Sequence, residues 1–195
     1  MHYPKNYEEL TTGQYIALAN WDGLDFAELL ESWSGEDYDL CLRELENLPV
    51  DVFDWMDEDI PAKLNAEEIP NKLKIKGEKV KIQKDLAVDL FGKKMYVANI
   101  IKAVNLKDTE KDKSLELINN IPLIVAVYLC DKYYPEYSGE NVEKLRELLL
   151  EMPAREVYPV ALFFFRKFKN LMPFKPSSLV SGVSGELEEA LNARN

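Results

Sequence analysis

The chain has 195 residues, 47% of them hydrophobic and 30% charged, which is enough for one domain with a core and too short for two of ordinary size. The net charge of −11 disfavours nucleic acid as a partner, because phosphate contacts need lysine and arginine gathered on one surface. The longest apolar run, residues 121–130, is shorter than a bilayer span, and the first residues are polar, so we expect neither a membrane segment nor a secretory signal.

The charge is unevenly distributed along the chain. Residues 1–69 contain 18 acidic and 3 basic side chains (net −15), whereas residues 70–113 contain 6 acidic and 12 basic ones (net +6). The two cysteines, Cys41 and Cys130, lack CxxC spacing and lie in apolar helical patterns. We therefore expect buried free thiols and a reducing compartment, the cytoplasm.

Four short helices are predicted in the acidic first third of the chain, over residues 11–19, 25–33, 37–45 and 50–59. Thr11 or Thr12 is a suitable N-cap for the first, and Asp22 or Asp25 for the second. The second is expected to end at Gly35. Pro49 is expected to open the fourth.

The hydrophobic period changes from 3.6 to 2 in residues 72–83, which predicts a β-hairpin. Its apolar face would consist of Leu73, Ile75, Val80 and Ile82, with lysines on the other face. The Gly77-Glu78 pair predicts a type II′ turn. Because an isolated two-stranded hairpin is marginal in water, its apolar face must pack on helices or on further strand.

Helical periodicity returns after the hairpin. We expect helices over residues 92–105, 114–119, 122–132, 141–151 and 154–171, with residues 107–113 and 133–139 as loops. Pro122 suits the first turn of its helix, Ser138 is a candidate cap, and Pro159 is expected to kink the last helix. Residues 173–195 are predicted to be a flexible tail, with a transient helix at 186–191.

These elements together predict a mainly α (α+β) fold. A single compact multi-helix domain is expected over residues 1–172. It comprises an acidic helical part at 7–60, one inserted two-stranded β-hairpin near 72–83, and apolar helices at 91–171.

Catalytic and cofactor chemistry finds little support in the sequence. The single histidine is His2, and no phosphate-binding or dinucleotide-binding glycine motif is present. The densest carboxylate cluster, at Asp54, Asp57, Glu58 and Asp59, does not have the spacing of a calcium-binding EF-hand loop. We interpret it as a solvated face, with an acidic docking surface or a divalent-metal site as alternatives. We expect a non-enzyme without cofactor or metal.

Five aromatic residues are candidates for binding a partner protein. Phe163 and Phe164 belong to an aromatic run, and Trp21, Trp33 and Trp55 lie at the edges of predicted helices. Core packing is the default explanation for all five, and a tryptophan at a core edge buries its ring and keeps its N–H in contact with water.

Two motifs stand near the ends of the predicted domain. One is the Thr-Thr-Gly-Gln-Tyr segment at residues 11–15, and the other is the Met-Pro-Ala segment at 152–154, followed by Pro159 and the three phenylalanines at 163–165. With the acidic helices and lysine-rich hairpin between them, residues 7–171 resemble small proteins encoded in the tail and virion gene clusters of tailed bacteriophages, some of which are tail assembly chaperones. The resemblance brings no catalytic residues.

The resemblance implies a non-catalytic assembly factor that binds an aggregation-prone tape-measure or other tail protein in the host cytoplasm. The alternatives are a minor structural protein of the head–tail connector, located in the virion, and another protein-interaction module. In each case the partner is another protein, not nucleic acid or membrane, and the oligomeric state is open.

Overall fold

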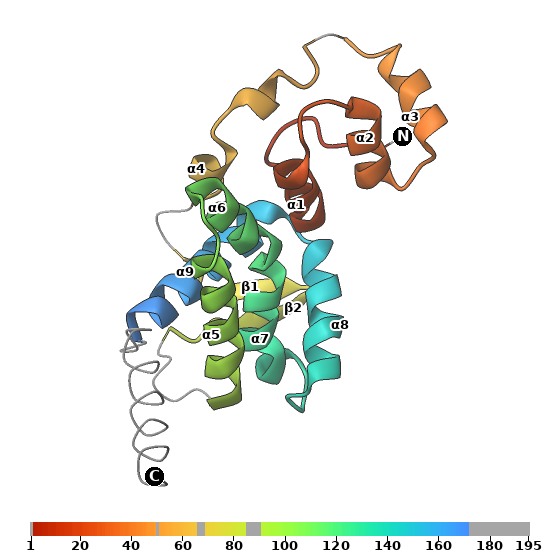
Figure 1. Ribbon diagram of the computed structural model, residues 1–195. Coiled ribbons are helices and arrows are strands. Elements are labelled where there is room, and N and C mark those ends of the chain that lie inside the picture. Colours follow the sequence, from red (N-terminus) through yellow and green to blue (C-terminus); the bar gives the residue numbers. More distant parts are fainter. Residues whose placement is uncertain (1, 50, 66–68, 85–90, 172–195) are drawn as a thin grey trace, which may run out of the picture.

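The computed structural model describes residues 2–49, 51–65, 69–84 and 91–171 (Figure 1). It is mostly helical, with a small antiparallel sheet, as the sequence predicts. The first three helices form an arm at one end of the molecule, and the later helices and the hairpin form a body at the other. The predicted tail at 173–195, with its helix at 186–191, lies outside the described residues.

The arm and the segment that follows it contain short helices. They are α1 (Thr12–Asn20), α2 (Phe26–Ser34), α3 (Tyr38–Leu45), the 3₁₀ helix η1 (Asp54–Asp57) and α4 (Ile60–Leu64). The side chain of Thr11 accepts the N–H of Gln14 and the Gln14 side chain accepts the N–H of Thr11, which forms a capping box. Asp25 caps α2, and Gly35 ends it with a φ of 71°. These predicted boundaries are confirmed.

The continuous helix predicted over residues 50–59 is wrong. Residues 51–53 form turns, η1 is a single 3₁₀ turn, and the α-helix begins only at Ile60. Asp59 is the N-cap of α4, and its carboxylate accepts the N–H of Ala62. Aspartate favours caps and turns over helix interiors, because its short side chain bonds to nearby backbone. An aspartate-rich segment therefore breaks into short turns.

The hairpin consists of β1 (Lys72–Ile75) and β2 (Glu78–Lys81), paired with Leu73 opposite Val80. The predicted inner face is confirmed, because Leu73, Ile75, Val80 and Ile82 are all buried. The turn lies one residue earlier than expected, at Lys76 and Gly77. Both residues have positive φ, 45° and 91°, which is the type I′ pattern and not the type II′ pattern.

Replacing Lys76 with asparagine is expected to stabilise the protein. A lysine in the left-handed region costs about 1 kcal/mol, whereas Asn-Gly is the preferred type I′ pair. The ion pair that would be lost, with Glu151 at 3.7 Å, is exposed and contributes little. Thermal unfolding followed by circular dichroism should show a Tm higher by a few degrees. An unchanged or lower Tm would contradict this account of the turn.

The body contains five longer helices. They are α5 (Phe91–Asn105), α6 (Glu110–Asn119), α7 (Ile121–Tyr133), α8 (Gly139–Leu150) and α9 (Ala154–Leu171). Ser138 caps α8, and Pro122 lies in the first turn of α7, as predicted. The loop predicted at 107–113 is too long, because Thr109 caps α6 by accepting the N–H of Asp112. The mixed-charge residues 110–113 are therefore the exposed first turn of a helix.

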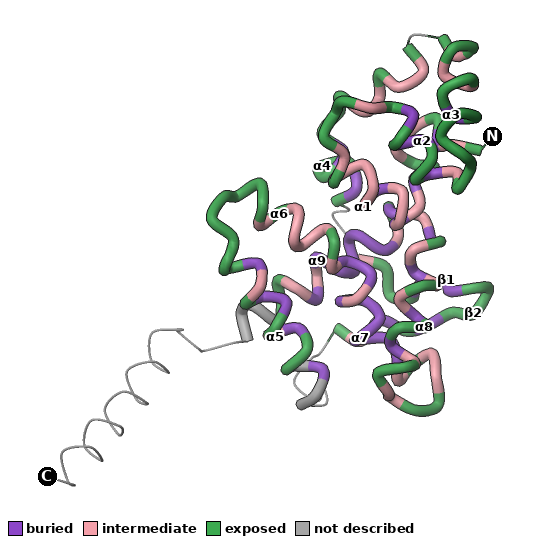
Figure 2. Tube along the Cα trace, turned by 45° about the vertical axis from the view of Figure 1, so that its right-hand side comes forward, coloured by how far each residue is buried: buried purple, intermediate pink, exposed green. Residues whose placement is uncertain are grey.

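The core is centred on α7, which packs against α8, α9, α5 and β2. Residues 124–130 of this helix are all buried, so it is apolar on every side (Figure 2). Cys41 and Cys130 are both free and buried, as predicted. In α9, Pro159 is buried and lies inside the helix, within a buried run at residues 157–162.

One stretch is long and apolar enough to cross a membrane by length and composition. It covers Glu110–Tyr133, with a mean hydropathy of 1.3 in its best window. We did not expect this stretch from the sequence, because we considered the longest uninterrupted apolar run and not the mean hydropathy over a window. Half of the window is buried inside the fold, as in the core helix of a globular protein.

The two motifs at the ends of the domain meet in the fold. Thr11 and Pro153 form an isolated antiparallel bridge, and the N–H of Thr12 donates to the carbonyl of Met152 at 2.7 Å. The buried Thr12 hydroxyl donates to the same carbonyl at 3.0 Å. The first and last motifs therefore fasten α1 of the arm to the start of α9.

Candidate functional site

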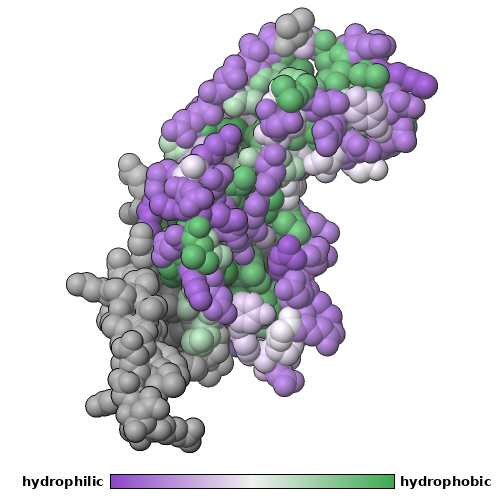
Figure 3. Space-filling view, viewed as in Figure 1, coloured by the Kyte–Doolittle hydropathy of each residue, from purple (hydrophilic) through white to green (hydrophobic). Residues whose placement is uncertain are grey.

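An open apolar groove of about 920 Å³ lies on the arm, at its junction with α6. Its walls come from α1, α2, the end of α3, the segment between α3 and α4, the start of α4, and one residue of α6. The apolar lining residues are Tyr15, Leu18, Ala19, Trp21, Phe26, Leu45, Leu48, Pro49, Val52, Phe53, Met56, Ile60, Pro61 and Ile118. Figure 3 shows hydrophobic residues exposed on the arm among hydrophilic ones. A concave, mostly apolar surface is the common form of a binding site.

Aromatic rings form a continuous cluster along this groove and behind it. Phe26 contacts Trp21 and Phe53, with ring centroids 4.6 and 5.3 Å apart. Trp33 lies 6.4 Å from Phe53 and stacks on Trp55 at 6.2 Å. We call these five residues the aromatic cluster. It brings together the three tryptophans singled out from the sequence, through two phenylalanines that the sequence did not single out.

The three tryptophans occupy different positions in the aromatic cluster. Trp21 is partly buried and lines the groove, and its indole N–H donates to the carbonyl of Asp25 at 2.9 Å. Trp33 is buried behind the groove and donates to the carbonyl of Gln14 at 3.0 Å. The Nε1 atom of Trp55 is buried without a hydrogen-bond partner in the part of the chain that the structure describes.

Tyr15 provides a polar atom next to the apolar lining. It is 3% exposed, and its hydroxyl interacts with that of Tyr158 in α9, whose ring lies edge-on to it with centroids 5.7 Å apart. Burial raises the pKa of this phenol far above its ordinary value, so the hydroxyl keeps its proton at neutral pH. The Tyr15 hydroxyl is therefore a neutral polar group beside the apolar lining.

The rim of the groove is acidic. Asp54, Asp57 and Glu58 belong to its lining, and all three are exposed. The clustered carboxylates noted in the sequence therefore border an apolar surface. Among the residues that the structure describes, no group of three or more His, Cys, Asp or Glu is arranged to hold a metal ion.

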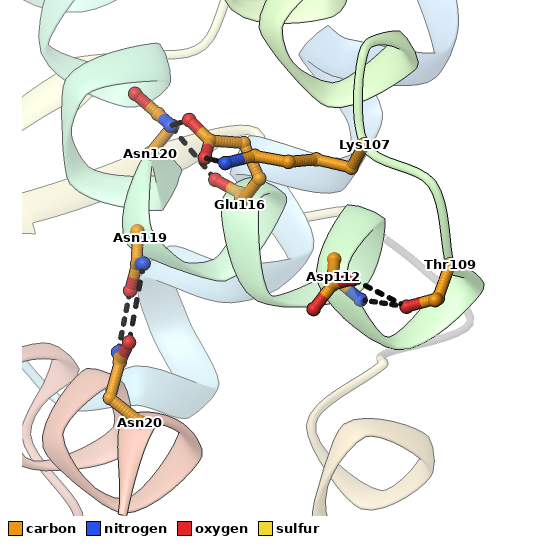
Figure 4. A network of polar contacts seen from close by, with 7 residues as sticks. All are labelled: Asn20, Lys107, Thr109, Asp112, Glu116, Asn119 and Asn120. Atoms are coloured by element: carbon orange, nitrogen blue, oxygen red, sulfur yellow. Dashed lines mark hydrogen bonds and ion pairs between the residues drawn. The ribbon is translucent and has the colours of Figure 1, made fainter.

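A polar contact between arm and body holds one wall of the groove. The side-chain amides of Asn20 in α1 and Asn119 in α6 exchange hydrogen bonds of 2.7 and 3.4 Å (Figure 4). Glu116 accepts from Asn120 and pairs with Lys107 at 3.1 Å, which anchors this end of α6. Ile118, next to Asn119, is thereby held beside α1.

The other two candidates from the sequence lie elsewhere. Phe164 is 1% exposed in the body, where its ring stacks on Tyr128 with centroids 4.2 Å apart. Phe163 is partly buried, and its ring centroid lies 5.4 Å from that of Phe164. Neither residue lines the groove. The structure therefore separates the phenylalanine pair from the tryptophans.

Several groove residues escaped the sequence analysis. Phe26 opens α2 and is 37% exposed, and Phe53 lies in the segment predicted as a helix over residues 50–59, which does not form. Each has a carboxylate as a sequence neighbour, Asp25 and Asp54, but this signal is weak because single exposed apolar residues are common.

Comparisons of the chain with protein-family models, with curated proteins and with solved structures found no match.

Proposed function

We propose that the chain is a non-catalytic protein-binding factor whose groove receives an apolar helical segment of a partner. The observation that carries the proposal is the groove itself: an open apolar surface of about 920 Å³, backed by the aromatic cluster. Grooves of this kind bind amphipathic helices through apolar residues spaced three and four apart. Aromatic side chains dominate the binding energy of such interfaces.

The negative charge of the rim indicates the charge of the partner segment. Asp54, Asp57 and Glu58 border the groove, and residues 1–69 have a net charge of −15. A cationic helix, with lysine or arginine flanking its apolar stripe, is complementary to this surface, and an acidic helix is repelled. The partner segment we propose is therefore a basic amphipathic helix.

The resemblance to phage tail-cluster proteins gives a biological setting for this activity. In that setting the chain is a chaperone-like assembly factor, and the client is a long helical tape-measure or other tail protein in the host cytoplasm. Strong net charge of one sign would keep such a complex soluble and limit non-specific association. The first and last motifs, which carry the resemblance, fasten the arm to the body and so position the groove.

Peptide binding tests the groove directly. A leucine–lysine amphipathic helical peptide should bind the full chain and change its tryptophan fluorescence, because Trp21 lines the groove. A leucine–glutamate peptide of equal length should not bind. Met56→Glu, which places a charge on the lining, should weaken the binding of the leucine–lysine peptide about tenfold or more. Isothermal titration calorimetry provides the affinities.

Leu106→Glu is the matched control, because Leu106 is 72% exposed and does not line the groove. It should bind the peptide as the parent chain does, and circular dichroism should show both variants folded. Equal binding by Met56→Glu and Leu106→Glu would overturn the groove assignment.

Co-expression with the tape-measure protein of the same phage tests the setting. We expect a more soluble client and a co-eluting complex. An unchanged client solubility with no complex would refute the chaperone role. Stoichiometric recovery of the chain from purified particles would favour a minor structural protein of the virion instead.

A further inference from the structure

The outer face of the hairpin is made of lysine. Lys72 and Lys74 in β1, and Lys79 and Lys81 in β2, are all exposed, because they alternate with the buried residues of the inner face. The strand register places Lys72 opposite Lys81 and Lys74 opposite Lys79. We call these four residues the lysine face. It is a fixed array of positive charge on an otherwise acidic protein.

The array is unfavourable for the isolated chain. Like charges directly opposite one another destabilise a β-ladder. Among the described residues, no carboxylate lies within 4.0 Å of these four ammonium groups, and the ion pair of Lys76 with Glu151 at 3.7 Å involves the turn. The chain contains 35 acidic residues, yet none of those that the structure describes forms an ion pair with this face.

The lysine face is also held rigidly. The inner side chains of the hairpin are 0–4% exposed, and β2 packs against the central helix α7. Unlike lysines on a mobile loop, these four are presented at fixed spacing. A partner surface that matches them loses little conformational entropy in the backbone of the hairpin.

Opposite charge is concentrated on the arm. Exposed carboxylates on α2 and near α3 include Glu28, Glu31, Glu36 and Asp39. The same end of the molecule exposes apolar side chains, with Leu40 at 46% and Leu42 at 44%. Such a surface suits lysines, whose methylene stems cover apolar groups while their ammonium groups reach carboxylates.

We propose that the lysine face binds the acidic arm of a second copy of this chain. The hairpin lies within the body, apart from α2 and α3 of the arm, in both views (Figures 1 and 2), so the two surfaces of one chain do not meet. The contact joins two different patches, so it is either made twice in a two-fold dimer or repeated head-to-tail into a ring or a helical array. Nucleic acid is the weaker candidate, because the remaining acidic surface of a chain with net charge −11 repels phosphate.

Sedimentation velocity of the full chain tests the contact. At about 0.01 M ionic strength, where the Debye length is about 30 Å, concentration-dependent larger species are expected. At about 1 M, where it is about 3 Å, the chain should sediment as a monomer. The double variant Lys74→Glu/Lys79→Glu should weaken association about tenfold or more. This variant replaces one like-charge pair by another, so the repulsion within the hairpin is kept.

Two further variants distinguish a specific contact from a general effect of charge. Lys102→Glu/Lys111→Glu makes the same change in net charge at exposed positions outside the hairpin and should associate as the parent does. The arm variant Glu31→Lys/Glu36→Lys/Asp39→Lys should not associate alone. Mixed with Lys74→Glu/Lys79→Glu, it should form a complex, because each variant retains one of the two complementary surfaces.

A chain that stays monomeric at low ionic strength would overturn the proposal, as would equal association of the hairpin variant and its control. Binding of a short DNA duplex that is lost in Lys74→Glu/Lys79→Glu, by a chain that does not self-associate, would assign the lysine face to nucleic acid instead. The groove proposal is independent of these outcomes, since the groove lining contains none of the residues changed in these variants.

Discussion

Replacing Phe164 with alanine should destabilise the protein by about 3–5 kcal/mol, enough to remove much or all of the stability of a typical domain. The side chain is 1% exposed and stacks on Tyr128 of the central helix at 4.2 Å. Its removal loses the transfer free energy of a large aromatic group and leaves a cavity between α7 and α9. Urea denaturation followed by circular dichroism measures the loss.

Phe163→Ala is the control for this prediction. Phe163 is the adjacent residue on the same helix, has the same chemistry and is only partly buried. Phe163→Ala should therefore lower the free energy of unfolding by at least about 1 kcal/mol less than Phe164→Ala does. Equal losses would mean that the two rings are buried to a similar extent in solution. The two variants also distinguish a core residue from a surface residue, because only Phe163 is exposed enough to bind a partner.

Much of the fold follows from local signals in the sequence. The capping box at Thr11 and Gln14, the end of α2 at Gly35 and the alternation of the hairpin each depend on a few neighbouring residues. The failures have local causes too. Aspartate caps broke the helix predicted at 50–59, and the twist of paired strands favours a type I′ turn at Lys76 even without asparagine there.

The groove was harder to predict because it depends on contacts between distant segments. The sequence singled out Trp21, Trp33 and Trp55, but their convergence requires Phe53, from a segment with little regular structure, to contact α2. Ile118 joins the wall only because α6 contacts α1 through residues 99 positions apart. Hydrophobic periodicity contains no information on such pairings.

Lys93 illustrates a further limit of periodicity. It is 0% exposed, although it is a lysine followed by a second lysine at the start of α5. It precedes the buried residues Val97 and Ile100 by four and seven positions, so it belongs to the apolar face by position. Tyr96, directly before Val97, is 43% exposed. A lysine placed on the buried face needs a compensating carboxylate, and Asp131 of α7 provides one.

Removing the carboxylate of Asp131 should lower the free energy of unfolding more than removing Lys93 does. The ammonium of Lys93 lies 2.7 Å from Asp131 and donates to the carbonyl of Tyr128 at 3.3 Å. Asp131→Leu removes the carboxylate that lies 2.7 Å from a fully buried ammonium group and should cost about 3–5 kcal/mol of unfolding free energy. Lys93→Met should cost about 1–3 kcal/mol, because Asp131 remains 24% exposed and lies 3.5 Å from Lys132.

The double variant Lys93→Met/Asp131→Leu completes the cycle. It removes both charges together and fills the space with apolar side chains, so its stability should lie within about 1 kcal/mol of the parent. Urea denaturation of the four proteins then provides the coupling energy between the two residues. A double variant as unstable as the sum of the single variants would mean that the two residues act independently, and Asp131 would not be the partner that allows Lys93 to be buried.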